Sequence, residues 1–349
     1  IRGFKSLPAP VHSSLNLYVI SMEASQPSPK SHILDEYEKT LIASLPKKDG
    51  FSSLGQLYQF QGFWHSEKFL KGIISAQANF QAKPTDIVLA SYPKTGTTWL
   101  KALCVAIVTR SRFDDSTSPL LSRLPHDCIP FIEVDLVDVS EFSSDMALPL
   151  LATHVPFTSL PSSVMATPGC KVVYIWRDPK DAFVSMWHFV SKIMLSKGQK
   201  PPPMAEAFEL YCQGLVSFGP YWNHVAGYRK ASLENPDRIL VLKYEDVRTN
   251  TVRYVKKLAD FIGYPFTHEE VRNGEVEKIA SFCSLENMRG LGVNKAGKHH
   301  FGDIYSIDNS FYFRKGEIGD WRNCLTEEMG ARLDKIMEDN LEIAGLKMG

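Results

Sequence analysis

The chain has 349 residues, of which 44% are hydrophobic and 22% charged, which is the composition of a globular protein able to bury a large core. Its 39 Lys and Arg residues balance 39 Asp and Glu residues, so the zero net charge gives no reason to expect general binding to nucleic acid or an anionic membrane. The six cysteines form no CxxC pair, which argues against a zinc site or a disulfide scaffold and favours free thiols in a reducing compartment.

The first part of the chain is expected to lie outside the folded domain. Residues 1–30 mix Pro and Ser without periodicity, which is typical of a disordered N-terminal extension. The apolar patch at 15–20 is too short for a secretory signal peptide. The chain begins at Ile1, so Met22 is a second candidate for the true start. No run of about eighteen apolar residues predicts a membrane-spanning helix, and we expect a cytoplasmic protein.

Helix and strand patterns alternate along the rest of the chain. Residues 32–45 have helical periodicity, and the aromatic segment 57–64 predicts a core strand or a pocket wall. Three strand–turn–helix units follow, with strands within 86–91, 171–179 and 238–246 and helices over 97–110, 180–192 and 251–262.

The remaining segments are less regular. Amphipathic helices are predicted over 206–230 and 325–345, the second with Thr326 as its N-cap. Residues 290–313 contain glycines and little periodicity, which favours a mobile loop over a site.

Strands that alternate with helices predict an α/β fold, in which one central, mostly parallel sheet is flanked by helices. Such sheets bind ligands at the carboxyl ends of their strands. Polar motifs follow the three predicted strands at that edge: YPKTGTTW (92–99), RDPKDAFVS (177–185) and KYED (243–246).

Residues 91–99, SYPKTGTTW, form a candidate phosphate-binding turn. Gly96 lets the backbone turn tightly, and the helix that follows begins with free N–H groups that attract an anion. Lys94 adds a positive charge. Hydroxyl donors come from Thr95, Thr97 and Thr98. The common P-loop has its lysine after the second glycine, whereas Lys94 precedes Gly96. An ordinary strand-to-helix turn with a threonine cap is the alternative.

Two further segments contain candidate anion-binding cations. Arg177 lies at a predicted strand end, where its guanidinium can hold an anion, and Ser185 lies two helical turns later. A surface ion pair of Arg177 with Asp178 or Asp181 is the alternative. A second cluster, for which a solvated charge run is the alternative, consists of Arg314, Lys315 and Gly316.

His154 is the one candidate base. It lies in the segment ATHVP (152–156), and an imidazole can take a proton from a hydroxyl near neutral pH. Most single histidines have no such role, so the residue alone is weak evidence. His299 and His300 are adjacent and lack further ligands, so we assign no metal site.

Together and in this order, the segments resemble the cytosolic sulfotransferases. YPKTGTTW is similar to the phosphosulfate loop of that family, and YIWRDPKD (174–181) with Ser185 is similar to its 3′-phosphate region. THVP (153–156) and RKGEIGDW (314–321) resemble two further family elements. The segments LYQFQGFW (57–64) and VNKAGK (293–298) are similar to plant members.

The resemblance implies one domain over residues 31–349, with a fold related to the P-loop nucleotide kinases. It implies transfer of a sulfuryl group from 3′-phosphoadenosine 5′-phosphosulfate (PAPS) to a hydroxyl of a small acceptor, without a metal. His154 would be the general base, and Lys94 would stabilise the leaving phosphate oxygen. The donor would be held by Lys94, Thr95, Gly96, Thr97, Thr98, Trp99, Arg177, Ser185, Tyr244, Leu285, Arg314, Lys315 and Gly316.

Two elements depart from the family pattern. Leu285 stands where the family usually has an aromatic residue, so stacking on one face of the adenine would be lost. Arg322, Thr326, Glu327 and Ala331 replace the dimer element of mammalian members, so a monomer is expected.

Two other functions remain open, a kinase-like phosphotransferase and a catalytically inactive nucleotide-binding protein. The first would need carboxylates for magnesium and a differently placed lysine, and the presence of Lys94 and His154 argues against the second. The acceptor is not determined: a flavonoid, a steroid-like hormone, a glucosinolate precursor and a hydroxylated jasmonate all remain possible. Aromatic candidates for an apolar acceptor pocket are Phe60, Phe63, Trp64, Phe157 and Phe189.

Overall fold

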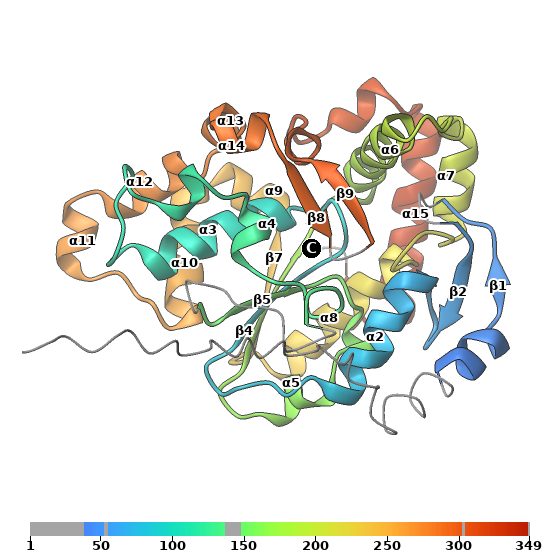
Figure 1. The fold of residues 1–349 in the computed structure, drawn as a ribbon, viewed down its shortest axis with the longest axis horizontal. Coiled ribbons are helices and arrows are strands. Elements are labelled where there is room, and N and C mark those ends of the chain that lie inside the picture. The colour runs from blue at the N-terminus through green and yellow to red at the C-terminus, as the bar shows by residue number, and fades with distance from the viewer. Residues whose placement is uncertain (1–37, 52–54, 137–147, 302–303, 348–349) are drawn as a thin grey trace, which may run out of the picture.

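The computed structural model describes residues 38–51, 55–136, 148–301 and 304–347, and a parallel sheet of four strands lies at its centre (Figure 1). The strand order is β5 (Leu150–Thr153), β4 (Ile87–Ser91), β6 (Lys171–Trp176) and β7 (Ile239–Lys243). Ala90 of β4 pairs with Thr153 on one side and with Tyr174 on the other. This register brings the residues that follow β4, β5 and β6 to one edge of the sheet.

Helices cover the sheet on both sides. In Figure 1, α3 (Thr97–Thr109) packs with α10 (Thr251–Ile262) and α12 (Glu275–Phe282), while α8 (Tyr221–Glu234) packs on β7 and against α15 (Glu327–Ile343). All residues of β4 are buried, as an apolar strand covered on both faces requires. The predicted α/β fold with a mostly parallel sheet and flanking helices is confirmed.

The other helices connect these layers. The α-helical ones are α2 (Glu67–Asn79), α4 (Pro125–Cys128), α5 (Ser162–Ala166), α6 (Pro179–Ser196), α7 (Met204–Cys212), α9 (Tyr244–Thr249), α11 (His268–Arg272), α13 (Leu285–Gly290) and α14 (Gly292–Lys295). The 3-10 turns are η1 (Pro119–Leu121), η2 (Phe157–Ser159), η3 (Asn309–Tyr312) and η4 (Asp320–Asn323). None of the helices in the described part of the chain is long and apolar enough to cross a membrane.

The N-terminal part forms a small antiparallel sheet of β1 (Lys47–Lys48), β2 (Leu57–Phe60) and β3 (Phe63–Ser66). The aromatic segment is therefore a strand hairpin, as one of its two interpretations predicted. Its other interpretation, a pocket wall, is wrong, since no residue of 57–64 lines the cavity described below. The predicted helix at 32–45 is present at 38–44, and its start, like residues 1–30, lies outside the described residues.

The predicted helix over 206–230 is wrong. The segment forms α7 and α8, which a turn separates. Gly214 has a φ of 74°, a backbone conformation that ends a helix, and α8 begins again after Pro220. The turn is tied to β3, because Phe218 N–H donates to Trp64 O at 2.7 Å.

Residues 290–313 have more regular structure than the predicted loop. They contain α14, an antiparallel hairpin of β8 (Lys298–Phe301) and β9 (Tyr305–Asp308), and η3. Residues of this segment do line the cavity, so its predicted place over a site is right. The cap of α15 is also as predicted, since Thr326 Oγ1 accepts from Met329 N–H at 3.2 Å.

Candidate active site

The turn between β4 and α3 opens a cavity at the carboxyl edge of the sheet. Gly96 has a φ of 120°, and a Cβ there would lie 2.9 Å from Tyr244 Cδ2, so the position requires glycine. The first N–H groups of α3 have no partner within the helix. Since Gly96, Thr97 and Thr98 line the cavity, these donors and the helix dipole form an anion site.

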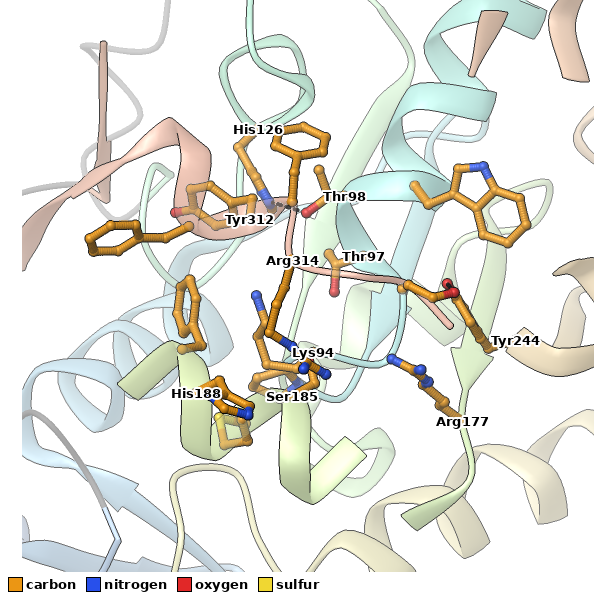
Figure 2. Close-up of a pocket in the computed structure, with 18 of the residues that line it drawn as sticks. Lys94, Thr97, Thr98, His126, Arg177, Ser185, His188, Tyr244, Tyr312 and Arg314 are labelled. Carbon is orange, nitrogen blue, oxygen red and sulfur yellow. Dashed lines mark hydrogen bonds between the residues drawn. The ribbon is translucent and has the colours of Figure 1, made fainter. Parts of the chain in front are cut away.

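The ammonium of Lys94 lies close to two aromatic rings. The Nζ atom lies 3.7 Å from the ring centroid of Phe189 and 5.5 Å from that of Tyr312. Burial and the positive charges of Arg314, Lys192 and Arg177 lower the pKa of Lys94 to about 7. Figure 2 shows the Lys94 and Arg314 side chains reaching the same space. An anion bound there would restore the charge of Lys94.

The three threonines of the turn differ in their bonding. Thr98 Oγ1 lies 2.9 Å from His126 Nε2 (Figure 2). Thr97 Oγ1 lies 2.6 Å from Ser91 Oγ. Thr95 is buried outside the cavity lining, and its hydroxyl bonds Tyr92 O and Ile175 O at 2.7 and 3.1 Å. The geometry therefore does not support the predicted use of the Thr95 hydroxyl as a ligand donor.

His154 follows β5 and lines the cavity from the other side of the turn. Its Nδ1 lies 2.8 Å from Ser91 O, and a carbonyl only accepts, so Nδ1 carries the proton. The Nε2 atom therefore holds the ring's lone pair. Burial lowers the pKa of His154 to about 3, which keeps the imidazole neutral. A neutral imidazole with a free Nε2 is the form that a general base requires.

Buried polar groups hold His154 in place. Glu133 accepts from the backbone N–H of His154 at 2.7 Å and from Thr153 Oγ1 at 2.9 Å. Burial raises the pKa of Glu133 to about 7. Behind the ring, His224 Nε2 donates to His154 O at 3.0 Å, and Tyr228 donates its hydroxyl to Val155 O at 2.7 Å. Sequence reasoning missed these partners, because Glu133 lies in a separate segment and His224 and Tyr228 lie on α8, all far from His154 in the sequence.

The predicted 3′-phosphate residues lie together, and two carboxylates already hold them. Arg177 Nη2 lies 3.3 Å from Asp181 Oδ2, so the ion pair that the sequence offered as an alternative is present. Asp181 also accepts from Gly319 N–H and Trp321 N–H at 2.7 and 3.0 Å. This carboxylate therefore joins the start of α6 to the segment around η4.

Asp320 likewise forms ion pairs with the second cluster of cations, Arg314 and Lys315. Its carboxylate lies 2.6 Å from both Arg314 Nη1 and Lys315 Nζ. Burial alone would raise the pKa of Asp320, but hydrogen bonds from Lys315, Asn323 and Arg314 hold it well below its usual range. Arg177 Nε and Arg314 Nε are buried and have no hydrogen-bond partner among the described residues. These two donors fit an anion in the cavity.

One end of the cavity is built around Tyr244. Its hydroxyl donates to Gly316 O at 2.8 Å, and its ring meets that of Trp99 edge to face at 5.5 Å. Gly316 has a φ of 64°, and a Cβ there would lie 2.5 Å from Leu285 Cδ2, so the leucine packs directly on the glycine. Ser185 lines the same cavity from α6.

One cavity thus contains all of the predicted site residues except Thr95. Phe189 is the one of the five predicted acceptor aromatics that lines it, whereas Phe60, Phe63, Trp64 and Phe157 lie in the packing of other elements. Aromatic residues that line it without having been predicted are Phe51, Phe69, Phe218, Phe301, Phe311, Tyr312 and Phe313. Polar residues that line it without having been predicted are His126, His188, Lys192, Ser217, Arg248, Thr251 and Ser284. No sequence motif identifies these residues, and only the fold brings them to the cavity.

The model of the sulfotransferase domain matches residues 84–345, which contain this cavity's anion-binding turn and His154. The chain belongs to the sulfotransferase family. "Cytosolic sulfotransferase 16" of Arabidopsis thaliana is 48% identical over 324 residues, which cover 90% of this chain and 94% of that protein. "Flavonol 3-sulfotransferase" of Flaveria bidentis is 48% identical over 290 residues, covering 83% of this chain and 92% of that one.

A solved structure agrees with the fold of this sulfotransferase. The mouse sulfotransferase SULT7A1 complexed with PAP has a TM-score of 0.62 and 26% identity, covering 83% of this chain and 97% of the mouse chain. Among the residues that the structure describes, no group of three or more His, Cys, Asp or Glu side chains could hold a metal ion.

Proposed function

We propose that this sulfotransferase transfers a sulfuryl group from PAPS to a hydroxyl of a small planar acceptor, with His154 as the general base. One observation carries the assignment of the base: the Nδ1–H···O bond to Ser91 leaves Nε2 as the lone-pair nitrogen of a residue that lines the cavity. The mouse relative complexed with PAP supports the donor, because PAP is the 3′-phosphoadenosine 5′-phosphate that remains after transfer.

The residues around the turn would hold the donor as the resemblance implies. Lys94, Gly96, Thr97, Thr98 and the first N–H groups of α3 would hold the 5′-phosphosulfate. The 3′-phosphate would be held by Arg177, Ser185, Arg314, Lys315 and Gly316, and the adenine would lie near Trp99, Tyr244 and Leu285. The unpartnered Nε atoms of Arg177 and Arg314 support this arrangement. The Thr95 hydroxyl is left out, because its single proton is already directed at the backbone carbonyls of Tyr92 and Ile175.

The reaction then needs positioning and one proton transfer. His154 Nε2 takes the proton of the acceptor hydroxyl, whose oxygen forms a bond to sulfur. The bond between sulfur and the 5′-phosphate oxygen breaks, and the negative charge on that oxygen is stabilised by Lys94 and the N-terminus of α3. Binding both reactants in line accounts for much of the acceleration.

The acceptor would be a flavonol or a similar hydroxylated ring system. Flavonol 3-sulfotransferase, at 48% identity, supports this class, and the aromatic lining of the cavity suits a flat apolar ligand.

Lys94 and the α3 N-terminus supply positive charge, so we propose catalysis without a metal.

The proposal also includes the organisation of the protein. The catalytic domain would cover residues 31–349 after a disordered extension, and the protein would be a cytoplasmic monomer that binds neither membrane nor nucleic acid. The relatives named cytosolic sulfotransferases, the zero net charge and the changed residues from Arg322 to Ala331 support these points. Light scattering should give a mass near 39.3 kDa, and a stable dimer at micromolar concentration would contradict the monomer.

Transfer of labelled sulfur from PAPS to a panel of flavonols, hydroxysteroids and hydroxylated acids tests the proposed function. Labelled sulfate ester without added magnesium is expected. Tight PAP binding with no transfer to any acceptor would instead favour an inactive nucleotide-binding protein. A strict magnesium requirement with phosphate transfer would favour a kinase-like enzyme.

A further inference from the structure

The charged side chains among the described lining residues of the cavity are all cationic. No Asp or Glu occurs among its described lining residues, whereas the Lys and Arg side chains are Lys94, Arg177, Lys192, Arg248, Arg314 and Lys315. In the proposed function, the donor's sulfuryl and phosphate groups use four of them. Arg248 lies on α9 with Tyr244, at the nucleotide end. Lys192 is left without a role.

Lys192 lies on the acceptor side of the reacting groups. Ser185, Phe189 and Lys192 share one face of α6, because helix residues three, four and seven apart lie above one another. At 1.5 Å per residue, Lys192 is about 10 Å further along the helix than Ser185, and about 5 Å beyond Phe189. Since the Phe189 ring contacts Lys94 and Ser185 belongs to the 3′-phosphate end, Lys192 lies beyond the sulfuryl group.

The surroundings of Lys192 leave its charge available. Its Nζ lies over the Phe311 ring at 5.4 Å, and Phe311 lines the same cavity. In the described part of the chain Lys192 has no carboxylate partner, in contrast to the pairs that Arg177, Arg314 and Lys315 form. The side chain is half-buried, so water screens its charge only in part. Its field reaches Lys94, whose pKa it helps to lower.

We propose that Lys192 binds an anionic group on the acceptor, so that the preferred substrates are planar hydroxylated molecules that also carry a carboxylate or a sulfate. A negative group there would offset the repulsion between Lys192 and Lys94. A cationic acceptor would meet several positive charges and no carboxylate among the described lining residues, so we expect it to be a poor substrate. This specificity rests on the proposed function, because that function defines the acceptor end of the cavity.

Four acceptors with the same ring and hydroxyl test the specificity. They are 7-hydroxycoumarin-3-carboxylate, the corresponding 3-sulfonate, the neutral ethyl ester and the cationic 2-aminoethyl amide. Transfer from PAPS is measured for the unmutated protein, Lys192→Met, Lys192→Glu and the control Lys200→Met. Lys200 is exposed and does not line the cavity, so its replacement removes the same charge elsewhere.

The unmutated protein should use the anionic acceptors with a kcat/KM at least about tenfold above that of the ester, as one charge-assisted contact provides. The amide should be the poorest substrate. In Lys192→Met the anion-to-ester ratio should fall to within about twofold, in Lys192→Glu the amide should overtake the anions, and in Lys200→Met the ratio should persist. A preference for only one of the two anions would identify the group that is recognised.

Equal use of anion and ester by the unmutated protein would overturn the proposal, as would an anion-to-ester ratio that survives in Lys192→Met. If no coumarin is turned over, calorimetric titration of each into the protein saturated with PAP gives the answer. Anion-selective binding that needs Lys192 would then support the specificity while counting against the proposed transfer. Absence of anion-selective binding would contradict the specificity alone.

Discussion

The 3′-phosphate of the donor should account for a large share of its affinity. Three cations surround its proposed site, and Asp181 and Asp320 already pair with them. The phosphate therefore gains less than three full charge-assisted bonds, each worth about 1.5–3 kcal/mol. Two such bonds at the low end give about 3 kcal/mol, which is roughly a hundredfold in affinity. PAP should bind at least that much more tightly than adenosine 5′-phosphate.

Calorimetric titration of both nucleotides into the unmutated protein, Arg177→Ala and the control Arg112→Ala measures this preference. Arg112 is exposed and does not line the cavity. In Arg177→Ala the preference for PAP should shrink about tenfold or more, since one charge-assisted bond is lost, while adenosine 5′-phosphate keeps its contacts with the turn at Gly96. Equal affinity of the unmutated protein for the two nucleotides would refute the reasoning and would favour a kinase-like site.

Further predictions concern the turn itself. Lys94→Ala should lower turnover by about 10²–10³-fold with an unchanged melting temperature, the usual loss for an oxyanion-stabilising donor, and near-normal turnover would contradict its role. At pH 8 most Lys94 side chains are neutral because their pKa is about 7, so PAP binding should be accompanied by the uptake of close to one proton. Titrations in buffers of different ionisation enthalpy measure this uptake, and Lys94→Met should abolish it. Gly96→Ala should weaken PAP binding in the same titrations, since its Cβ would meet Tyr244 at 2.9 Å in a strained backbone; unchanged affinity would show that the turn adapts.

The elements with regular patterns could be predicted from the sequence. The strands β4, β6 and β7 could be predicted from their apolar runs and the helices that follow them from helical patterns, and the alternation of the two favours a parallel sheet. β5 has only four residues, too few for a pattern to identify it. The error at 206–230 has a local cause, because apolar periodicity continues across Gly214 while the backbone turns there.

Part of the candidate site could also be predicted from the sequence, and part could not. The cations, the glycine turn and His154 could be found because they lie in short motifs after strands. Glu133 and His224 contact His154 from distant segments, and no spacing in the sequence identifies them. Asp181, by contrast, is the ion-pair partner that the sequence offered for Arg177. The acceptor aromatics were mostly predicted wrongly, because composition cannot separate a ring in the core from a ring that lines a cavity. Whether each residue acts as proposed remains a prediction that mutation must test.

The rate of sulfuryl transfer in a single turnover by His154→Ala tests the central claim most directly. With saturating PAPS and an accepted substrate, the rate should fall by at least about a hundredfold, the usual contribution of a general base, while the affinity for PAP stays within about threefold. The control His268→Ala, at an exposed position on α11, should leave both unchanged. A normal rate in His154→Ala, or a collapse of PAP affinity with a surviving rate, would contradict the account.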